Sequence, residues 1–251
     1  MATPTTNTTQ ELGSSSHGID LITFALLNSQ TGNILTGSEG LSDNGLAPIY
    51  QGVQGATNAE YQNLEREGTK VYANDVPKRV TRPTQAPTAS LTFLDIDWTV
   101  LNKLIGYEQS EDGGYSLSSG AKPYFAMLTR STFLDGSALY EAFACATAIL
   151  PGNPHQTDND SEQDANVTLT VDAYQPINPN VFKLKSGKQA PYRKWNSMDK
   201  NFDPEQMIQS VFPGYTIDDT MSIVVPSYKP KDSTKTVVTP PNAGNQATQG
   251  K

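Results

Sequence analysis

The sequence predicts a mainly β protein: a β-sandwich-like domain of about eight short strands with one short helix packed against it. Three observations support this fold class. Short runs rich in β-branched and aromatic residues recur along the chain, and clusters of Gly, Pro, Asn, Asp and Ser separate them. Several of these runs alternate apolar and polar residues, as half-buried strands do. Only one stretch of the body has the apolar spacing of a helix followed by a glycine.

The first strands are predicted before the helix. Ile19–Asn28 is apolar and β-branched, and a turn cluster stops it. Leu46–Gln54 and Ala56–Glu67 are predicted as two further strands, because glycines lie between them. The second of these is unusually polar, which predicts an edge or rim position. Two prolines in 82–87 then break the chain before a strand at Ala89–Leu94.

The short helix is predicted directly after that strand. Asp95 or Asp97 would cap it, because a carboxylate at a helix start accepts hydrogen bonds from free backbone amides. The apolar residues at helical spacing are Trp98, Leu101, Leu104 and Ile105, and Gly106 ends the helix. A helix of about two turns depends on tertiary packing for its stability. We therefore expect this apolar face, Trp98 included, to be buried against the sheet.

The most strongly predicted strand pair is Pro123–Arg130 and Ala138–Leu150, joined around Asp135-Gly136, a hairpin signal. Strict alternation in the second strand gives one face that is almost all alanine: Tyr140, Ala142, Ala144, Ala146 and Ala148. Such a face lets a neighbouring layer approach closely, so the strand is expected to be buried on both sides. Asn166–Tyr174 alternates cleanly and is predicted as the last strand.

Composition divides the chain into three parts. Residues 1–18 are rich in Thr, Ser and Asn and are predicted to form a flexible N-terminal arm. Residues 19–187 form the body, and residues 188–251 form a C-terminal extension. The first part of this extension is expected to be a small appendage or an arm that folds against a neighbour. Its last part, 227–251, is predicted to be disordered.

Charge follows the same division. Residues 1–187 hold 20 acidic against 10 basic side chains, net −10, and residues 188–251 hold 6 against 8, net +2. An acidic body disfavours a surface that grips DNA, since phosphate binding needs clustered Lys and Arg. The first residues lack the basic and apolar parts of a signal peptide, and no run is apolar enough to cross a membrane. A soluble chain made in the cytoplasm is expected.

Candidate catalytic residues are few. The two histidines, His17 and His155, fall in an arm and a loop, and Cys145 falls in a predicted buried strand, where a thiol stays protonated. No nucleophile, base and orienting group are brought together, so no enzyme is predicted. Asp95 and Asp97 resemble a carboxylate pair of a glycosidase, but their place beside a helix start favours capping.

An acidic loop contains candidate metal ligands, namely Asp158, Asp160, Glu162 and Asp164. An EF-hand loop starting at Asp158 would need Gly and Glu at its sixth and twelfth positions, where this chain has Gln163 and Leu169. The EF-hand motif therefore fails. An irregular calcium site remains the alternative, a solvated acidic loop is favoured, and no cofactor is predicted.

Several short motifs follow one another in a fixed order between Gly18 and Lys185. They are KVYANDVP at Lys70–Pro77, SLTFLDID at Ser90–Asp97, LNKLIGY at Leu101–Tyr107, KPYFAML at Lys122–Leu128, FLDGSALYEAF at Phe133–Phe143, TDND at Thr157–Asp160 and NVTLTVDAY at Asn166–Tyr174. Together they resemble the major tail protein family of long-tailed bacteriophages. The extension after Lys185 is expected to lie outside the resemblance.

The resemblance implies a structural virion protein. Subunits would form hexameric rings with an inner β-barrel, and the rings would stack into a tail tube that conducts DNA without binding it specifically. The polar segment then supplies candidate ring or lumen contacts: Glu60, Tyr61, Glu65 and Glu67. Further implied partners are the tape measure, tail terminator and distal tail proteins. The implied location is the virion tail, after assembly in the host cytoplasm.

Three alternatives stay open. A head–tail joining or tail-terminator protein would form one ring and would not polymerise. A β-sandwich binding or adhesin module would present exposed aromatics on one face, and Tyr107, Tyr115 and Tyr124 are its candidates. A divergent enzyme is disfavoured because no catalytic constellation is visible.

Overall fold

The computed structural model describes residues 15–50, 54–81, 83–155 and 166–229. It confirms the predicted mainly β class. The strands are β1 (Ser16–Leu26), β2 (Ala47–Ile49), β3 (Gly55–Gln62), β4 (Thr69–Ala73), β5 (Val76–Thr81), β6 (Thr88–Asp95), β7 (Glu108–Gln109), β8 (Tyr115–Ser116), β9 (Phe125–Phe133), β10 (Ala138–Ile149), β11 (Val167–Ala173) and β12 (Tyr192–Asn196). The helices are η1 (Gly37–Glu39), α1 (Trp98–Ile105), α2 (Pro204–Val211) and α3 (Thr220–Val224).

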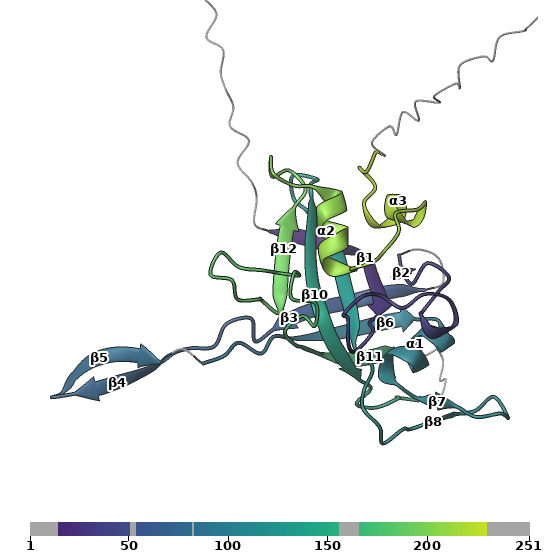
Figure 1. The fold of residues 1–251 in the computed structure, drawn as a ribbon, viewed down its shortest axis with the longest axis horizontal. Coiled ribbons are helices and arrows are strands. Elements are labelled where there is room, and N and C mark those ends of the chain that lie inside the picture. The colour runs from purple at the N-terminus through teal and green to yellow at the C-terminus, as the bar shows by residue number, and fades with distance from the viewer. Residues whose placement is uncertain (1–14, 51–53, 82, 156–165, 230–251) are drawn as a thin grey trace, which may run out of the picture.

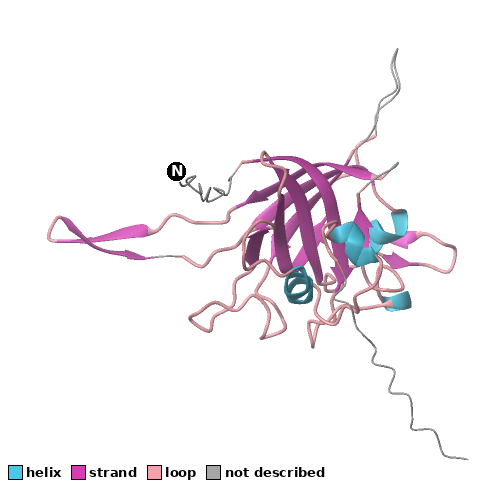
Figure 2. Cartoon of the chain, turned by 90° about the horizontal axis from the view of Figure 1, so that it is seen from above, coloured by secondary structure: helices cyan, strands magenta, loops and turns pink. Residues whose placement is uncertain are grey.

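One antiparallel sheet of eight strands forms the body (Figure 1). Seven strands follow the order β2-β1-β9-β10-β11-β6-β3, and β12 pairs with the first half of β10. The sheet is strongly curved, as Figure 2 shows from above, and β3 approaches β1. Its two ends therefore face each other across a core, which gives the sandwich-like packing. β4–β5 and β7–β8 are separate two-stranded hairpins outside this sheet.

Aromatic side chains fill the inside of the curled sheet. The ring of Phe24 on β1 lies 6.2 Å from that of Phe93 on β6 and 5.7 Å from that of Phe125 on β9, centroid to centroid. All three side chains are fully buried. Burying a side chain of this size stabilises the fold by about 1.5–3 kcal/mol, and tilted aromatic pairs add to this. We call this set the inner core.

Helix α1 packs on the inner core through Leu101, Leu104 and Ile105, which are buried. Asp97 caps it as predicted, since its Oδ1 accepts hydrogen bonds of 2.9 Å from the backbone amides of Thr99 and Val100. Gly106 ends it as predicted, with a left-handed φ of 72°. A Cβ on Gly106 would also lie 2.5 Å from Cδ of Pro123, so both backbone and packing require glycine here.

The expected burial of Trp98 is wrong. Trp98 is the first helical residue, and 63% of its surface is exposed. The indole contacts the ring of Tyr115 on the hairpin β7–β8, with centroids 5.9 Å apart, and Trp98 is not part of the buried inner core. Leu101, one turn later, is the first residue of the face to be buried.

The predicted alanine face of β10 is also wrong in part. The pairing of β10 with β9 shifts register between Phe143 and Ala146, which marks a β-bulge. Before the bulge, Ala142 and Ala144 face away from the inner core; after it, Ala146 and Ala148 face into it. The strand is nevertheless buried on both faces over most of its length, as expected.

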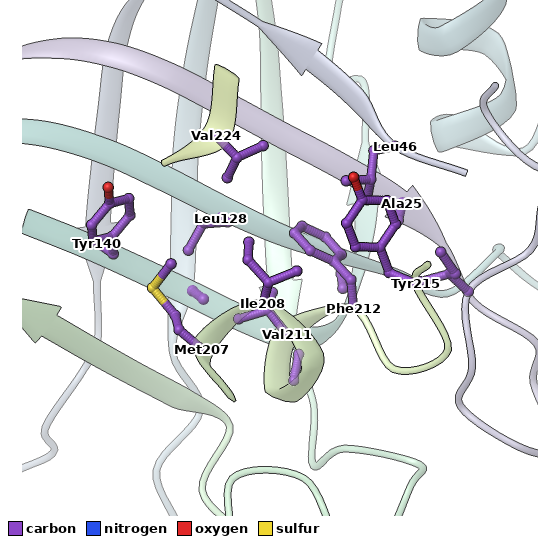
Figure 3. Packing of buried hydrophobic residues seen from close by; sticks show 14 of the residues in the cluster. Ala25, Leu46, Leu128, Tyr140, Met207, Ile208, Val211, Phe212, Tyr215 and Val224 are labelled. Carbon is purple, nitrogen blue, oxygen red and sulfur yellow. The ribbon is translucent and has the colours of Figure 1, made fainter. Parts of the chain in front are cut away.

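The C-terminal residues 192–228 pack on the other face of the sheet. β12 pairs with β10, and α2 places Met207, Ile208 and Val211 over β9 and β10 (Figure 3). Phe212, Tyr215, Met221 and Val224 complete this outer core, in which all seven side chains are buried. This segment therefore folds on its own chain. Neither α2 nor α3 was predicted from the sequence, although Asp203 caps α2 and Pro204 opens it, and both are local helix signals.

Other boundaries differ by a few residues. β1 starts at Ser16, inside the predicted arm, while residues 1–14 and 230–251 lie outside the described residues. β2 and β3 are shorter than the predicted strands, because β2 ends at Ile49 and β3 ends at Gln62. β6 and β11 match their predicted positions closely.

Candidate assembly surfaces

The hairpin β4–β5 projects from the body at one end of the molecule (Figures 1 and 2). Its turn is Asn74-Asp75, and both residues have left-handed backbone angles, φ 53° and 62°. Two consecutive left-handed residues twist a two-residue turn in the sense that a hairpin needs, and Asn and Asp tolerate this conformation. The KVYANDVP motif is therefore a hairpin. Its Asn-Asp pair is a local turn signal, and this hairpin was not predicted from the sequence.

Nearly every side chain of this hairpin is exposed. All residues from Tyr72 to Thr81 are exposed, and the large apolar ones among them are Tyr72 (61%), Val76 (45%) and Val80 (54%). An isolated two-stranded hairpin is at best marginally stable in water, and its strand edges offer unpaired backbone groups. The hairpin thus combines features that favour contact with another chain.

Basic residues predominate on β4–β5. Residues 69–81 carry Lys70, Lys78 and Arg79 against Asp75, a net charge of +2 within a body that is strongly acidic. All four side chains are exposed. The hairpin is therefore a basic, partly apolar projection.

The sequence-predicted contact residues lie on β3 and on the segment that leads to the hairpin. Glu60, Glu65 and Glu67 are exposed. Tyr61 instead points into the body, where its ring lies 5.1 Å from that of Phe143 and 5.6 Å from that of Tyr192. A role of these four residues in ring or lumen contacts stays a prediction.

A polar network surrounds Tyr61. Its hydroxyl donates to the backbone carbonyl of Glu141 at 3.1 Å and shares a hydrogen bond of 2.9 Å with the Thr129 hydroxyl. The Tyr192 hydroxyl donates to the Glu141 carboxylate. Burial raises the pKa of Tyr61 and of Tyr192, and the nearby Glu141 carboxylate raises both further. The network ties β3, β9, β10 and β12 together in neutral, hydrogen-bonded form.

A second exposed surface lies where α1 meets the hairpin β7–β8. Trp98 is 63% exposed. Its ring lies edge to face with that of Tyr115, with the centroids 5.9 Å apart and an interplanar angle of 86°. Leu94, at the end of β6 just before α1, is 47% exposed, and Leu117, just after β8, is 73% exposed. Four exposed carboxylates accompany them: Asp95, Glu108, Glu111 and Asp112. We call these eight residues the α1 patch.

The aromatic candidates of the binding-module alternative are not exposed platforms. Tyr107, Tyr115 and Tyr124 are each half-buried. Tyr107 lies under the Lys122 ammonium at 5.8 Å, and Tyr124 packs against the outer core and against Tyr174. The structure thus gives these three tyrosines packing roles within the chain.

A hydrogen-bonded cluster joins loop 42–46 to the start of α3. The Asn44 side-chain amide donates to Asp218 at 2.8 Å and to the Thr220 hydroxyl at 2.7 Å, and the Tyr215 hydroxyl donates to Asp218 at 2.5 Å. Partial burial alone would raise the pKa of Asp218, but the hydrogen bonds from Tyr215, Asn44 and Thr220 outweigh it and lower this pKa. The cluster is a structural fastening of the C-terminal segment.

Reactive and metal-binding candidates remain limited. Cys145 is buried, and burial raises the pKa of its thiol to about 11, which keeps it protonated and unreactive at neutral pH. The calcium candidates Asp158, Asp160, Glu162 and Asp164 lie outside the described residues. Among the residues that are described, no group of three or more His, Cys, Asp and Glu side chains could hold a metal ion. No helix in the same part of the chain is long and apolar enough to cross a membrane.

The curled antiparallel sheet and its projecting, exposed hairpins define a β structural subunit suited to contacts with other chains. The sequence model of the phage tail tube protein family matches residues 15–220. The chain therefore belongs to the phage tail tube protein family, a family of structural proteins of the virion tail. The match extends through β12 and α2, so the expectation that the resemblance stops at Lys185 is wrong. No curated protein matches the chain.

Proposed function

We propose that this protein is the major tail tube subunit: hexameric rings of it stack into the tube that conducts phage DNA to the host. The projecting β4–β5 hairpin is the observation that carries this proposal. It places Tyr72, Val76 and Val80 in water, where they contribute nothing to either core of their own chain. A neighbouring subunit in a ring or stack would cover them and stabilise the hairpin.

The open edges of the sheet support the same assembly. In the described chain, β3 lies at one end of the strand order and pairs with β6 alone, while the other end is the three-residue β2. An unpaired edge strand favours pairing with another chain, and closing strands into a shared barrel removes that edge. Strands of six subunits would together form the inner barrel, with Glu60, Glu65 and Glu67 as candidate contacts at the ring or lumen.

The charge of the chain suits a conduit. Residues 1–187 have a net charge of −10, and a wall of this sign repels phosphates and leaves DNA mobile.

The proposed partners in the virion are the tape measure, tail terminator and distal tail proteins, after assembly in the host cytoplasm. Terminal segments 1–18 and 227–251 are proposed to modulate polymerisation as arms on neighbouring subunits.

Electron microscopy of the purified protein at high concentration tests the assembly. We expect hexameric rings and tubes. In a matched variant, residues 69–81 are replaced by a short Gly-Ser turn, which should abolish tubes but leave the melting transition unchanged, since this segment lies outside both cores. As a control, replacing the exposed turn residues 185–187, which lie outside both exposed hairpins, tests whether changing any exposed turn has this effect.

The size of the assembly separates the proposal from its nearest alternative. A head–tail joining or tail-terminator protein would give single rings that never stack, and a binding module would stay monomeric. Either result would overturn the tube proposal.

The DNA-conduit step has its own test. Retention of duplex DNA by the assembled tubes is measured at about 50 mM salt, where electrostatic binding is strong. We expect little retention. Tight, salt-sensitive binding that persists after removal of residues 227–251 would contradict a non-binding lumen.

A further inference from the structure

Two exposed surfaces of opposite charge lie at opposite ends of the molecule. The β4–β5 hairpin projects at one end of the longest axis, and the α1 patch with β7–β8 lies toward the other end (Figures 1 and 2). The hairpin carries a net charge of +2 over residues 69–81. The segment 94–121 carries five acidic side chains against Lys103, a net charge of −4. One chain cannot bring these two surfaces together.

We propose that the β4–β5 hairpin of one copy docks on the α1 patch of the next copy. This inference rests on the proposed tube function and names the acceptor surface within it. The occupant is a second copy of this chain, because the chain itself carries both complementary partners.

The chemistry of the two surfaces matches. Each offers exposed apolar side chains beside charges: Tyr72, Val76 and Val80 on the hairpin, and Leu94, Trp98 and Leu117 on the patch. A contact between them buries apolar area and sets basic against acidic groups, which favours one register. Trp98 adds a specific acceptor for a cation, since the face of an indole attracts a guanidinium such as that of Arg79.

The basic residue inside the acidic segment does not oppose this contact. Lys103 donates through Nζ to the backbone carbonyls of Ser38 at 3.1 Å and Gly40 at 2.6 Å, so its ammonium is held by its own chain. Glu111 is exposed in the β7–β8 turn. Glu108 accepts a hydrogen bond of 2.7 Å from the Ser118 hydroxyl, and Asp95 and Asp112 each accept one from a nearby backbone amide, but all four carboxylates are exposed to a partner.

The geometry of such a contact is head to tail. Two different surfaces of one chain that bind each other give a heterologous interface, which generates a closed ring or an open stack. A two-fold dimer would instead need both contacts to form reciprocally between the same two copies, and it would be seen as a species that stops at two subunits. In the proposed tube the contact is not reciprocal, so each copy uses its hairpin on one neighbour and its patch on another.

Charge reversal in the full-length protein tests the pairing. Lys78→Glu with Arg79→Glu makes the hairpin acidic, and Glu108→Lys with Glu111→Lys makes the patch basic. Either pair alone should reduce the pelletable assembly by about tenfold or more, because like charges then meet at the interface. All four substitutions in one chain should restore it, and so should mixing the two variants. Lys188→Glu with Lys200→Glu, at exposed positions elsewhere, is the control and should leave assembly unchanged.

A cross-link gives an independent measurement. Val80→Cys in one variant and Leu117→Cys in another should join two copies through a short bifunctional thiol reagent, since the native Cys145 is buried. Circular dichroism melting verifies that each variant folds. If the reversal variants still form wild-type amounts of tube, or if the cysteine variants fail to cross-link, the docking inference is overturned and the tube function still stands. A wild-type protein that stays monomeric would instead refute the proposed function itself.

Discussion

Arg130 on β9 donates a hydrogen bond of 2.7 Å from Nη1 to the backbone carbonyl of Ile223 on α3. The same nitrogen donates to the carbonyl of Val224 at 3.0 Å, while Nε lies 3.7 Å from Oδ2 of Asp20. Carbonyls at the end of a helix have no partner within the helix, so the guanidinium satisfies groups that burial would otherwise leave unpaired. Through this contact the C-terminal segment closes the outer core.

Substituting Arg130 should therefore loosen the C-terminal segment. Arg130→Met keeps much of the volume but removes the donors, and we expect a loss of about 1.5–3 kcal/mol in the free energy of unfolding, the range for hydrogen bonds to charged groups. Urea unfolding measures the loss, and limited proteolysis should show earlier cleavage near α3. Arg79→Met, on the exposed hairpin, is the control and should change stability little. An unaltered free energy in Arg130→Met would show that α3 does not depend on this contact.

Truncating Leu104 should lower the free energy of unfolding more than truncating Trp98, although Trp98 is the larger residue. Leu104 is fully buried in the inner core, so Leu104→Ala should cost about 2–5 kcal/mol of unfolding free energy. Trp98 is 63% exposed, so Trp98→Ala should change it by about 0.5 kcal/mol or less. Thermal or urea unfolding of both variants makes the comparison. A large loss in Trp98→Ala would restore the sequence-based expectation that the indole is core.

These two residues illustrate what the sequence could predict. The start and end of α1 depend on a capping carboxylate and a left-handed glycine, which act within one turn of chain, and both were correctly predicted. Burial of Trp98 depends on where α1 lies relative to the sheet edge, which no local pattern contains. The same limit explains β10, because its bulge arises from pairing with β9 and moves Ala146 to the other face.

The C-terminal segment was harder still. Trp195, Met207 and Val224 lie far apart in the sequence. They form part of a core only because they pack against β1, β9 and β10. Local signals did mark α2, since Asp203 and Pro204 stand at a helix start, but a polar, Pro-rich tail nearby obscured them. For the assembly surfaces, the motif around Asn74-Asp75 could be recognised in the sequence, but the exposure of its side chains could not be predicted from it.

Asp97 should act through its cap. Asp97→Ala removes the acceptor for the amides of Thr99 and Val100, and we expect a loss of about 0.5–2 kcal/mol in unfolding free energy. Asp97→Asn is the matched control, because Asn caps helices about as well as Asp, and it should be close to wild type. Tube formation should persist in both variants. Abolished assembly in a stably folded Asp97→Asn protein would mean that the charge itself contacts a partner.

Alkaline pH should destabilise the fold through its buried tyrosines. Burial raises the pKa of Tyr140 to about 12, and it also raises the pKa of Tyr61, Tyr192 and Tyr215. An unfolded tyrosine loses its proton near pH 10, roughly its ordinary value. Between the two pKa values the unfolded chain binds fewer protons than the folded one, so stability is intact below about pH 10 and falls as the pH rises.

Tyr140 allows this prediction to be tested at one residue. With pKa values of about 10 unfolded and about 12 folded, its contribution to the loss should reach about 1.4 kcal/mol near pH 11. Its ring stacks on that of Phe202, with the centroids 5.6 Å apart and an interplanar angle of 9°. Tyr140→Phe therefore preserves the packing while removing the titrating hydroxyl. Urea unfolding from about pH 8 to pH 11 should therefore show a shallower decline in Tyr140→Phe than in wild type. Parallel declines in the two proteins would show that the hydroxyl of Tyr140 titrates in the folded state as it does in the unfolded chain.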